Sequence, residues 1–95
     1  MIVEYSKRFI KQAEQLDKKT RKALATAILK TKEAKSLADI PNCIKLSGYK
    51  KVYRIRISNH RAIFVQEIND TLFFEFVVSR GEVYNKRYKD LLKDK

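Results

Sequence analysis

Two arginines, Arg54 and Arg56, stand two positions apart in a segment whose apolar residues alternate with them. A period of two is typical of a β-strand, so both guanidinium groups are expected on one face, about 7 Å apart. Planar groups with several N–H donors match the oxygens of phosphate, which makes a nucleic-acid backbone the expected ligand. The alternative is an exposed sheet face, where basic side chains have no ligand and only discourage aggregation.

The arginine pair lies within residues 40–66, a stretch with cationic side chains and no carboxylate. Without acidic neighbours these cations create a local positive field. The whole chain has 22 Lys+Arg against 11 Asp+Glu and a net charge of +11, which favours a polyanionic partner, either nucleic acid or an acidic protein. We therefore predict that the binding surface contains Lys45, Lys50, Lys51, Arg54, Arg56 and Arg61.

Three further candidates stand near the ends of predicted strands. Arg61 opens one strand, Arg80 follows the most hydrophobic strand, and Tyr84 comes shortly after it. A rigid sheet can aim such side chains into a shared cleft. For Tyr84 an alternative remains open, in which the ring anchors the terminal helix at the edge of the core. His60 alternates with Arg61 along the strand, so a structural role on the opposite face is favoured.

The chain contains one cysteine and one histidine, Cys43 and His60. A disulfide framework and a cysteine-rich zinc site are therefore excluded, and we expect neither a metal nor another cofactor. No apolar run reaches the roughly 18 residues of a membrane span, and charges interrupt the first residues, where a signal peptide has its apolar core. The expected location is the cytoplasm, without a membrane partner.

The elements that hold these residues follow from the periodicity of the sequence. Ile2 to Tyr5 predict a short strand, and two helical stripes follow, with Ser6 and Asp17 as their N-caps. Alternating or continuously apolar segments then predict three strands, and the end of the chain predicts a short helix. The three strands and the helix cover residues 51–57, 61–67, 72–78 and 82–92.

With 95 residues the chain is expected to form one domain, residues 1–95. The order β-α-α-β-β-β-α predicts an α+β fold, in which an N-terminal helical hairpin packs on a small, mostly antiparallel four-stranded sheet. All helices are expected on one face, which leaves Arg54 and Arg56 on the open face. Residues 72–78 are apolar on nearly both faces, so this strand is predicted in the middle of the sheet.

Two segments resemble the RelE/ParE superfamily of bacterial toxin–antitoxin toxins. They are LSGYKKVYRIRISNHRAIF at 46–64 and FVVSRGEVY at 76–84. In that superfamily a strand pair Y-R-I-R-x-G-x-Y-R and a terminal element H-R-x-E-V-Y recur behind an N-terminal helical hairpin. The chain departs from the pattern at Ser79, where relatives have histidine, and at Asn59, where they have glycine. Asparagine tolerates the positive φ that such a turn uses.

The superfamily contains two activities. RelE-type members are ribosome-dependent endoribonucleases that cut mRNA, whereas ParE-type members poison DNA gyrase. By position, the resemblance implies that Arg54 and Arg56 hold the RNA backbone with Lys45, Lys50 and Lys51 nearby. It implies catalytic roles for Arg61, Arg80 and Tyr84. The RelE-type interpretation is favoured because all five matching residues are present, while a ParE-type gyrase inhibitor or a non-toxic RNA-binding domain stays open.

The implied reaction is attack of the RNA 2′-OH on the adjacent phosphate, which yields a 2′,3′-cyclic phosphate and a 5′-OH. Arginine stabilises the charged transition state but transfers protons poorly, because an unperturbed guanidinium stays protonated above pH 12. Tyr84 is therefore the best proton carrier nearby, and His60 comes second. The resemblance also implies three partners: a cognate acidic antitoxin, the ribosome and mRNA.

Overall fold

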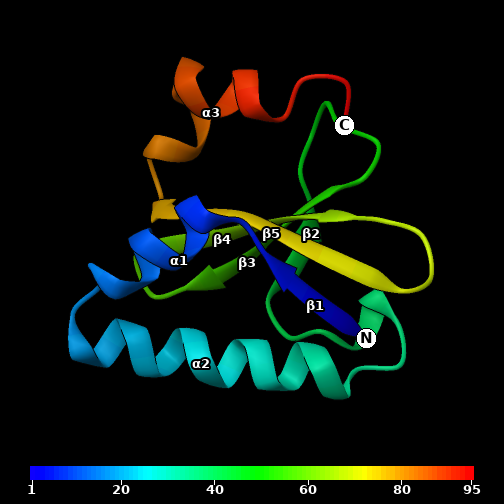
Figure 1. The fold of residues 1–95 in the computed structure, drawn as a ribbon, viewed down its shortest axis with the longest axis horizontal. Helices are drawn as coiled ribbons and strands as arrows, with labels where there is room; N and C mark the ends of the chain where they lie inside the picture. Colours follow the sequence, from blue (N-terminus) through cyan, green and yellow to red (C-terminus); the bar gives the residue numbers. More distant parts are fainter.

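The computed structural model describes residues 1–95, which fold into an α+β architecture (Figure 1). The strands are β1 Ile2–Tyr5, β2 Cys43–Lys45, β3 Val52–Ile57, β4 His60–Gln66 and β5 Thr71–Ser79. The helices are α1 Lys7–Glu14, α2 Lys18–Glu33 and α3 Lys86–Leu91, with short 3-10 helices η1 Leu37–Asp39 and η2 Glu82–Tyr84. None of the helices combines the length and the apolar character that crossing a bilayer requires.

Both N-terminal helices begin at the residues that the sequence predicts as caps. Ser6 Oγ accepts a hydrogen bond from the Phe9 N–H at 2.9 Å, and the Asp17 carboxylate accepts one from the Thr20 N–H at 3.4 Å. Each bond satisfies a backbone donor that the first helical turn leaves free. The Ser6 hydroxyl also donates to the Glu75 carbonyl at 2.6 Å, so the start of α1 is fastened to β5.

A five-stranded mixed sheet in the order β1-β5-β4-β3-β2 forms the centre of the molecule. β1 runs parallel to β5, and all other neighbouring strands are antiparallel. The first strand of the chain therefore pairs with the last one. β5 lies inside the sheet between β1 and β4, as the apolar character of both its faces predicts.

The predicted four-stranded sheet is wrong, because the sheet has a fifth strand. Three of its four strand pairs are antiparallel, and the parallel pair of β1 and β5 makes the sheet mixed. The missed strand is β2, which pairs antiparallel with β3 and places Cys43 opposite Ile55. Three residues are too few to show a period of two in the sequence. Backbone bonds extend the pairing beyond the strand, since the Leu46 N–H donates to the Val52 carbonyl at 2.8 Å.

The predicted N-terminal helical hairpin is also wrong, because α1 and α2 pack on the sheet and hardly on each other. α1 lies over β5, whereas α2 lies over β3 and β1. Phe9 of α1 is buried, with ring centroids 5.5 Å from Tyr5 and 5.3 Å from Phe74. Leu24 of α2 is buried in the same core. The sheet covers the apolar stripe of each helix, so no stripe is left to join the two helices.

The third helix lies on the other side of the sheet from α2 (Figure 1), so the prediction that all helices share one face is wrong. Tyr88 of α3 packs on Phe76 of β5 with ring centroids 4.5 Å apart, and Val83 and Leu92 are buried beside it. We call this side the α3 face and the other side the α2 face. The core has one part on each, because Phe74 belongs to the α2 face and Phe76 to the α3 face.

Candidate active site

The hairpin of β3 and β4 brings three arginines to the α3 face. Arg56 lies directly opposite Arg61 in the strand register, and Arg54 lies opposite Ile63. Residues that are directly opposite point to the same face, and Ile63 belongs to the core beneath α3. The alternation that the sequence predicts for this strand is therefore confirmed, with its basic side chains on one face and its core residues Ile55 and Ile57 on the other.

The β3–β4 turn positions the backbone of a fourth arginine, Arg80. Ser58 has a φ of 55°, in the left-handed region that residues other than glycine rarely adopt. The expectation that Asn59 takes this conformation is wrong, because the preceding serine takes it instead. The Asn59 carbonyl accepts a hydrogen bond from the Arg80 N–H at 2.8 Å. The start of the segment after β5 is thereby fixed beside the β3–β4 turn.

Arg61 folds back over the same turn. One terminal nitrogen of its guanidinium donates to the His60 carbonyl at 2.9 Å and to the Ser58 carbonyl at 3.2 Å. Partial burial lowers the pKa of Arg61 below its usual value, and the positive charges of the neighbouring arginines lower it further. Those neighbours are Arg54, Arg56 and Arg80. The guanidinium groups are thus close enough to repel one another, and an anion bound between them would relieve the repulsion.

A cavity of about 230 Å³ lies where these groups meet. Its walls contain three arginines, one tyrosine, one valine and no carboxylate: Arg54, Arg61, Arg80, Val83 and Tyr84. They come from β3, β4 and the segment that follows β5. The residues predicted to share a cleft, Arg61, Arg80 and Tyr84, therefore come together, and Arg54 of the predicted binding surface joins them. Such a set of guanidinium donors is suited to a phosphate group.

Glu82, which precedes the cavity residues Val83 and Tyr84 in the chain, is held by a contact that sequence reasoning missed. Ser79 donates to Glu82 Oε1 from its hydroxyl at 2.6 Å and from its backbone N–H at 3.3 Å. Glu82 is therefore engaged with Ser79 and does not line the cavity. The spacing Ser-x-x-Glu is that of a helix capping box, so the sequence contained the signal. This contact shapes the turn between Arg80 and Tyr84.

Tyr84 is free to meet a ligand, because 66% of its surface is exposed. The alternative interpretation, in which Tyr84 anchors the terminal helix at the edge of the core, is wrong. Val83 has that role, since it is only 3% exposed and packs in the core beneath α3. Tyr84 therefore stands at the cavity as a side chain with an accessible hydroxyl.

The other predicted binding residues do not line this cavity. Arg56 is exposed and lies at its margin, where its charge lowers the pKa of Arg61. Lys45 lies opposite Tyr53 in the register and so faces the α2 face. Lys50 and Lys51 are exposed and line hollows farther along the molecule. The structure thus brings four of the eight predicted site residues into the cavity, places Arg56 at its margin and separates the three lysines from it.

His60 and Cys43 lie away from the cavity. His60 pairs with Ser79 and points to the α2 face, and its Nδ1 is buried without a hydrogen-bond partner. Burial raises the pKa of Cys43 to about 11, which Arg54 opposes, so the thiol is protonated near neutral pH. No three His, Cys, Asp or Glu side chains gather where they could hold a metal ion. Among the residues that line the cavity, Tyr84 is the one suited to transfer a proton, because the other polar residues are arginines.

The fold and this cavity define a small basic protein with a cavity of three arginines and one tyrosine on one face of a mixed sheet. The chain is 33% identical over 86 residues to Toxin RelE3 of Methanocaldococcus jannaschii, an alignment that covers 90% of this chain and 97% of that protein. No protein-family model matches the chain. On this similarity, the chain belongs to the RelE family of toxins.

Solved structures of this family have the same fold. A chain of the crystal structure of the RelB–RelE antitoxin–toxin complex from Methanococcus jannaschii matches with a TM-score of 0.72 and 28% identity. That match covers 86% of this chain and 95% of the other. A chain of the intact E. coli RelBE toxin–antitoxin complex matches with a TM-score of 0.66 and 21% identity, over 82% of this chain and 94% of the other. The second likeness shows the fold alone.

Proposed function

We propose that this toxin is an endoribonuclease that cuts mRNA on the ribosome and inhibits translation. The observation that carries the proposal is the cavity lined by Arg54, Arg61, Arg80 and Tyr84, which contains three cationic donors and no carboxylate. Phosphoryl chemistry needs stabilisation of negative charge more than any other assistance, and preorganised cations provide it. We expect the scissile phosphate to lie between the three guanidinium groups.

In this reaction the 2′-oxygen of the RNA attacks the neighbouring phosphorus, and the bond from phosphorus to the 5′-oxygen breaks. The 2′-hydroxyl loses a proton, and the departing 5′-oxygen gains one. We assign the proton transfer within the cavity to Tyr84, because its hydroxyl is exposed there and His60 points to the other face. The second transfer falls to water, to the RNA or to the ribosome.

The proposed site depends on outside help to orient its substrate. The cavity is small and open, and its lining provides a single proton carrier. Correct placement of the 2′-oxygen in line with the leaving group contributes several kcal/mol to such reactions, and a large assembly can provide it. We therefore assign the ribosome as the partner that presents the mRNA to the α3 face.

The second proposed partner is an acidic antitoxin. The Methanococcus jannaschii and E. coli relatives are toxins seen in complexes with antitoxins. On this chain the arginines of the cavity would attract an acidic segment, which would cover the site and block RNA. Because such attraction between exposed charges is screened by ions, binding of the antitoxin should weaken as salt increases.

The test is to add the purified chain to ribosomes that are translating a defined mRNA and to map the new RNA ends. We expect fragments with 2′,3′-cyclic phosphate and 5′-OH ends in the presence of ribosomes and none without them. The Arg61→Ala variant is the matched control. Intact mRNA together with inhibited DNA gyrase supercoiling would contradict the proposal and would establish the gyrase-directed alternative.

A further inference from the structure

A second basic hollow lies at the other end of α3 from the arginine cavity. Its volume is about 570 Å³, and four of its seven lining residues are lysines. These are Lys50, Lys89, Lys93 and Lys95. The lining contains one acidic residue, Asp94, and one aromatic residue, Tyr49. We call this region the lysine hollow.

Two distant segments of the chain build the lysine hollow. Figure 1 shows the loop before β3 beside the C-terminal end of the chain, above the sheet. The Lys51 N–H donates to the Lys95 carbonyl at 3.0 Å, which ties the two segments together. Leu46 and Leu92 are buried beneath them in the core of the α3 face. Packing therefore fixes the distance between lysines that the sequence separates by about forty positions.

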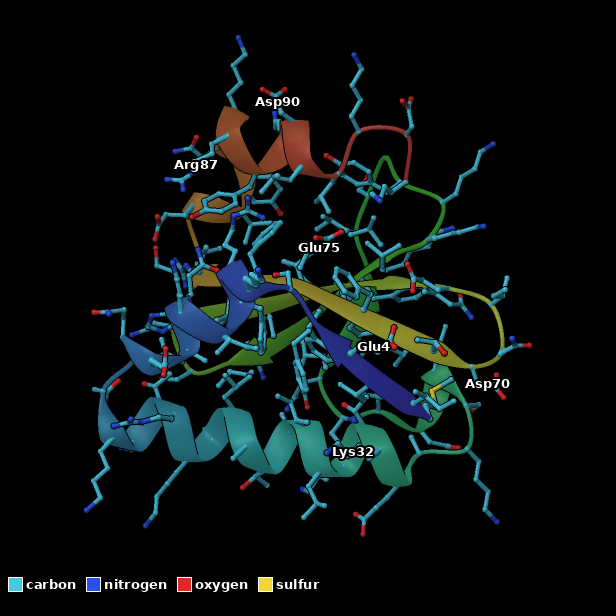
Figure 2. All side chains as sticks on the ribbon, viewed as in Figure 1. Glu4, Lys32, Asp70, Glu75, Arg87 and Asp90 are labelled. Carbon is cyan, nitrogen blue, oxygen red and sulfur yellow. The ribbon has the colours of Figure 1, made fainter.

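Three of the four lysines of the hollow have no ion-pair partner within the protein. The only ion pair of the structure joins Lys95 to Glu75, whose oxygen is 4.0 Å away. Figure 2 shows Glu75 between α3 and the sheet, and Asp90 on the outer side of α3. Lys50, Lys89 and Lys93 have no carboxylate partner. Clustered like charges repel one another, and a bound anion would relieve that repulsion.

The lysine hollow and the arginine cavity both lie on the α3 face of the sheet. Val83, next to the cavity residue Tyr84, and Leu92, next to the hollow residue Lys93, pack in the same core. Lys50 and Arg54 are four positions apart along the chain, which separates their Cα atoms by at most about 13 Å. One extended polyanion can therefore reach both sites.

We infer that the lysine hollow is a second binding site for the phosphodiester backbone of RNA, which holds a stretch of the strand outside the cut. The inference rests on the proposed function, because it takes RNA to be the substrate. Lysine is a point charge on a flexible stem and binds phosphates without reading sequence. Tyr49 is the single hydrophobic residue of the lining, so a protein segment would find little apolar surface for anchoring.

The experiment compares two triple variants that lose the same charge at different places. One is Lys50→Gln, Lys89→Gln and Lys93→Gln in the lysine hollow. The matched control is Lys18→Gln, Lys19→Gln and Lys22→Gln on the exposed side of α2. The probe is a labelled 2′-O-methyl RNA of about 16 nucleotides, which cannot be cleaved by 2′-OH attack, and its affinity is measured over a range of salt concentrations.

We expect the hollow variant to reduce the slope of log affinity against log salt by about 2, because each lost phosphate contact with a single strand removes about 0.7. The control should retain most of the slope of the unmodified chain. Lys89→Gln alone should remove about 0.7, which keeps the test decisive if the triple variant fails to fold. Circular dichroism checks the folding of each variant.

An unchanged slope in the folded hollow variant overturns the inference. The inference is also overturned if the hollow variant loses binding to a polyglutamate peptide but keeps binding to RNA. The hollow would then be a binding site for an acidic protein segment. Ribosomal cleavage by the unmodified chain is measured separately. If the unmodified chain cleaves mRNA but the hollow variant keeps the full salt slope, only the lysine hollow is contradicted. If the hollow variant has a reduced salt slope but the unmodified chain does not cleave, only the proposed nuclease activity is contradicted.

Discussion

The two sides of β3 put the same strand to different uses. On the α2 face, Tyr53 stacks on Phe64 with ring centroids 5.4 Å apart, and Phe64 lies 5.2 Å from Phe74. On the α3 face, Arg54 meets Arg61 and further cations with no carboxylate between them. Burial of aromatic surface stabilises the fold, whereas clustered like charges oppose it. The difference teaches that stability and ligand binding are separable here, and substitutions on the two faces should affect different measurements.

The largest expected effect comes from the aromatic face. Phe64 is fully buried between Tyr53 and Phe74, so Phe64→Ala leaves a cavity and should lower the free energy of unfolding by about 3–5 kcal/mol. Urea unfolding followed by circular dichroism measures the loss. Cleavage by the fraction that remains folded should be normal. A loss below about 1 kcal/mol would show that the α2 face is not the main source of stability.

The opposite pattern is expected for the arginine cavity. Arg61→Ala and Arg80→Ala should each lower the cleavage rate on ribosomes by about 10²–10³-fold, because each removes a preorganised donor to the phosphate. The free energy of unfolding should change by only about 0.5 kcal/mol, since neither side chain fills the core. Cleavage at the normal rate in both variants would reject the cavity as the active site.

Two tyrosines on opposite faces allow a matched comparison. Tyr84→Phe removes one hydroxyl from the cavity and should lower single-turnover cleavage about 10²-fold without changing ribosome affinity. Tyr53→Phe removes the same atom from the α2 face and should leave cleavage unchanged. If both variants cut at the normal rate, Tyr84 is a contact surface, and the proton transfers belong to the ribosome or the RNA.

A smaller effect is expected at Gln12, whose side chain bonds both to β5 and to α3. The Gln12 side-chain oxygen accepts from the Val77 N–H at 3.0 Å, and its nitrogen donates to the Tyr88 hydroxyl at 3.0 Å. Gln12→Ala leaves the Val77 donor unpaired, so unfolding should become easier by about 1–3 kcal/mol. Tyr88→Phe loses only the second bond and should cost about 0.5–1.5 kcal/mol. Equal losses would contradict the role assigned to Val77.

The smallest effect concerns the thiol of the α2 face. Burial raises the pKa of Cys43 from 9.0 to about 11, so its reaction with a thiol reagent should increase near pH 11 and not near pH 9. The folded state favours the protonated thiol. Stability from this group is therefore complete below pH 9 and is lost as pH rises toward 11. Cys43→Ser should remove this part of the alkaline loss, and a thiol that reacts fully at pH 9 would contradict the burial.

Much of the fold could be predicted where side-chain patterns are long and clear. The alternation of Tyr53, Arg54, Ile55 and Arg56 assigned each residue to its face, and Ser6 predicted the start of α1. β2 was not predicted because backbone groups make its pairing and it extends over only three residues. The position of α3 could have been predicted from β5. A strand that is apolar on both faces needs a cover on each of them.

The site was predictable in part for the same physical reason. Residues on regular strands, such as Arg54 and Arg61, follow the period of the sheet. The lysine hollow forms where the loop before β3 contacts the C-terminal segment, and no local sequence pattern predicts that contact. Lys50 was therefore grouped with the arginines by sequence, although it lies beside Lys89 and Lys93.

The parallel pair of β1 and β5 sets an order of events during synthesis. Ile2 pairs with Thr71 and Tyr5 with Phe74, so β1 can pair only after β5 has been synthesised. Arg80 and Tyr84 are made later still. Contacts between such distant parts of a chain form slowly, because a long loop must close first. A ribosome that makes this chain thus carries an unfinished sheet and an incomplete arginine cavity until β5 and the segment after it have emerged.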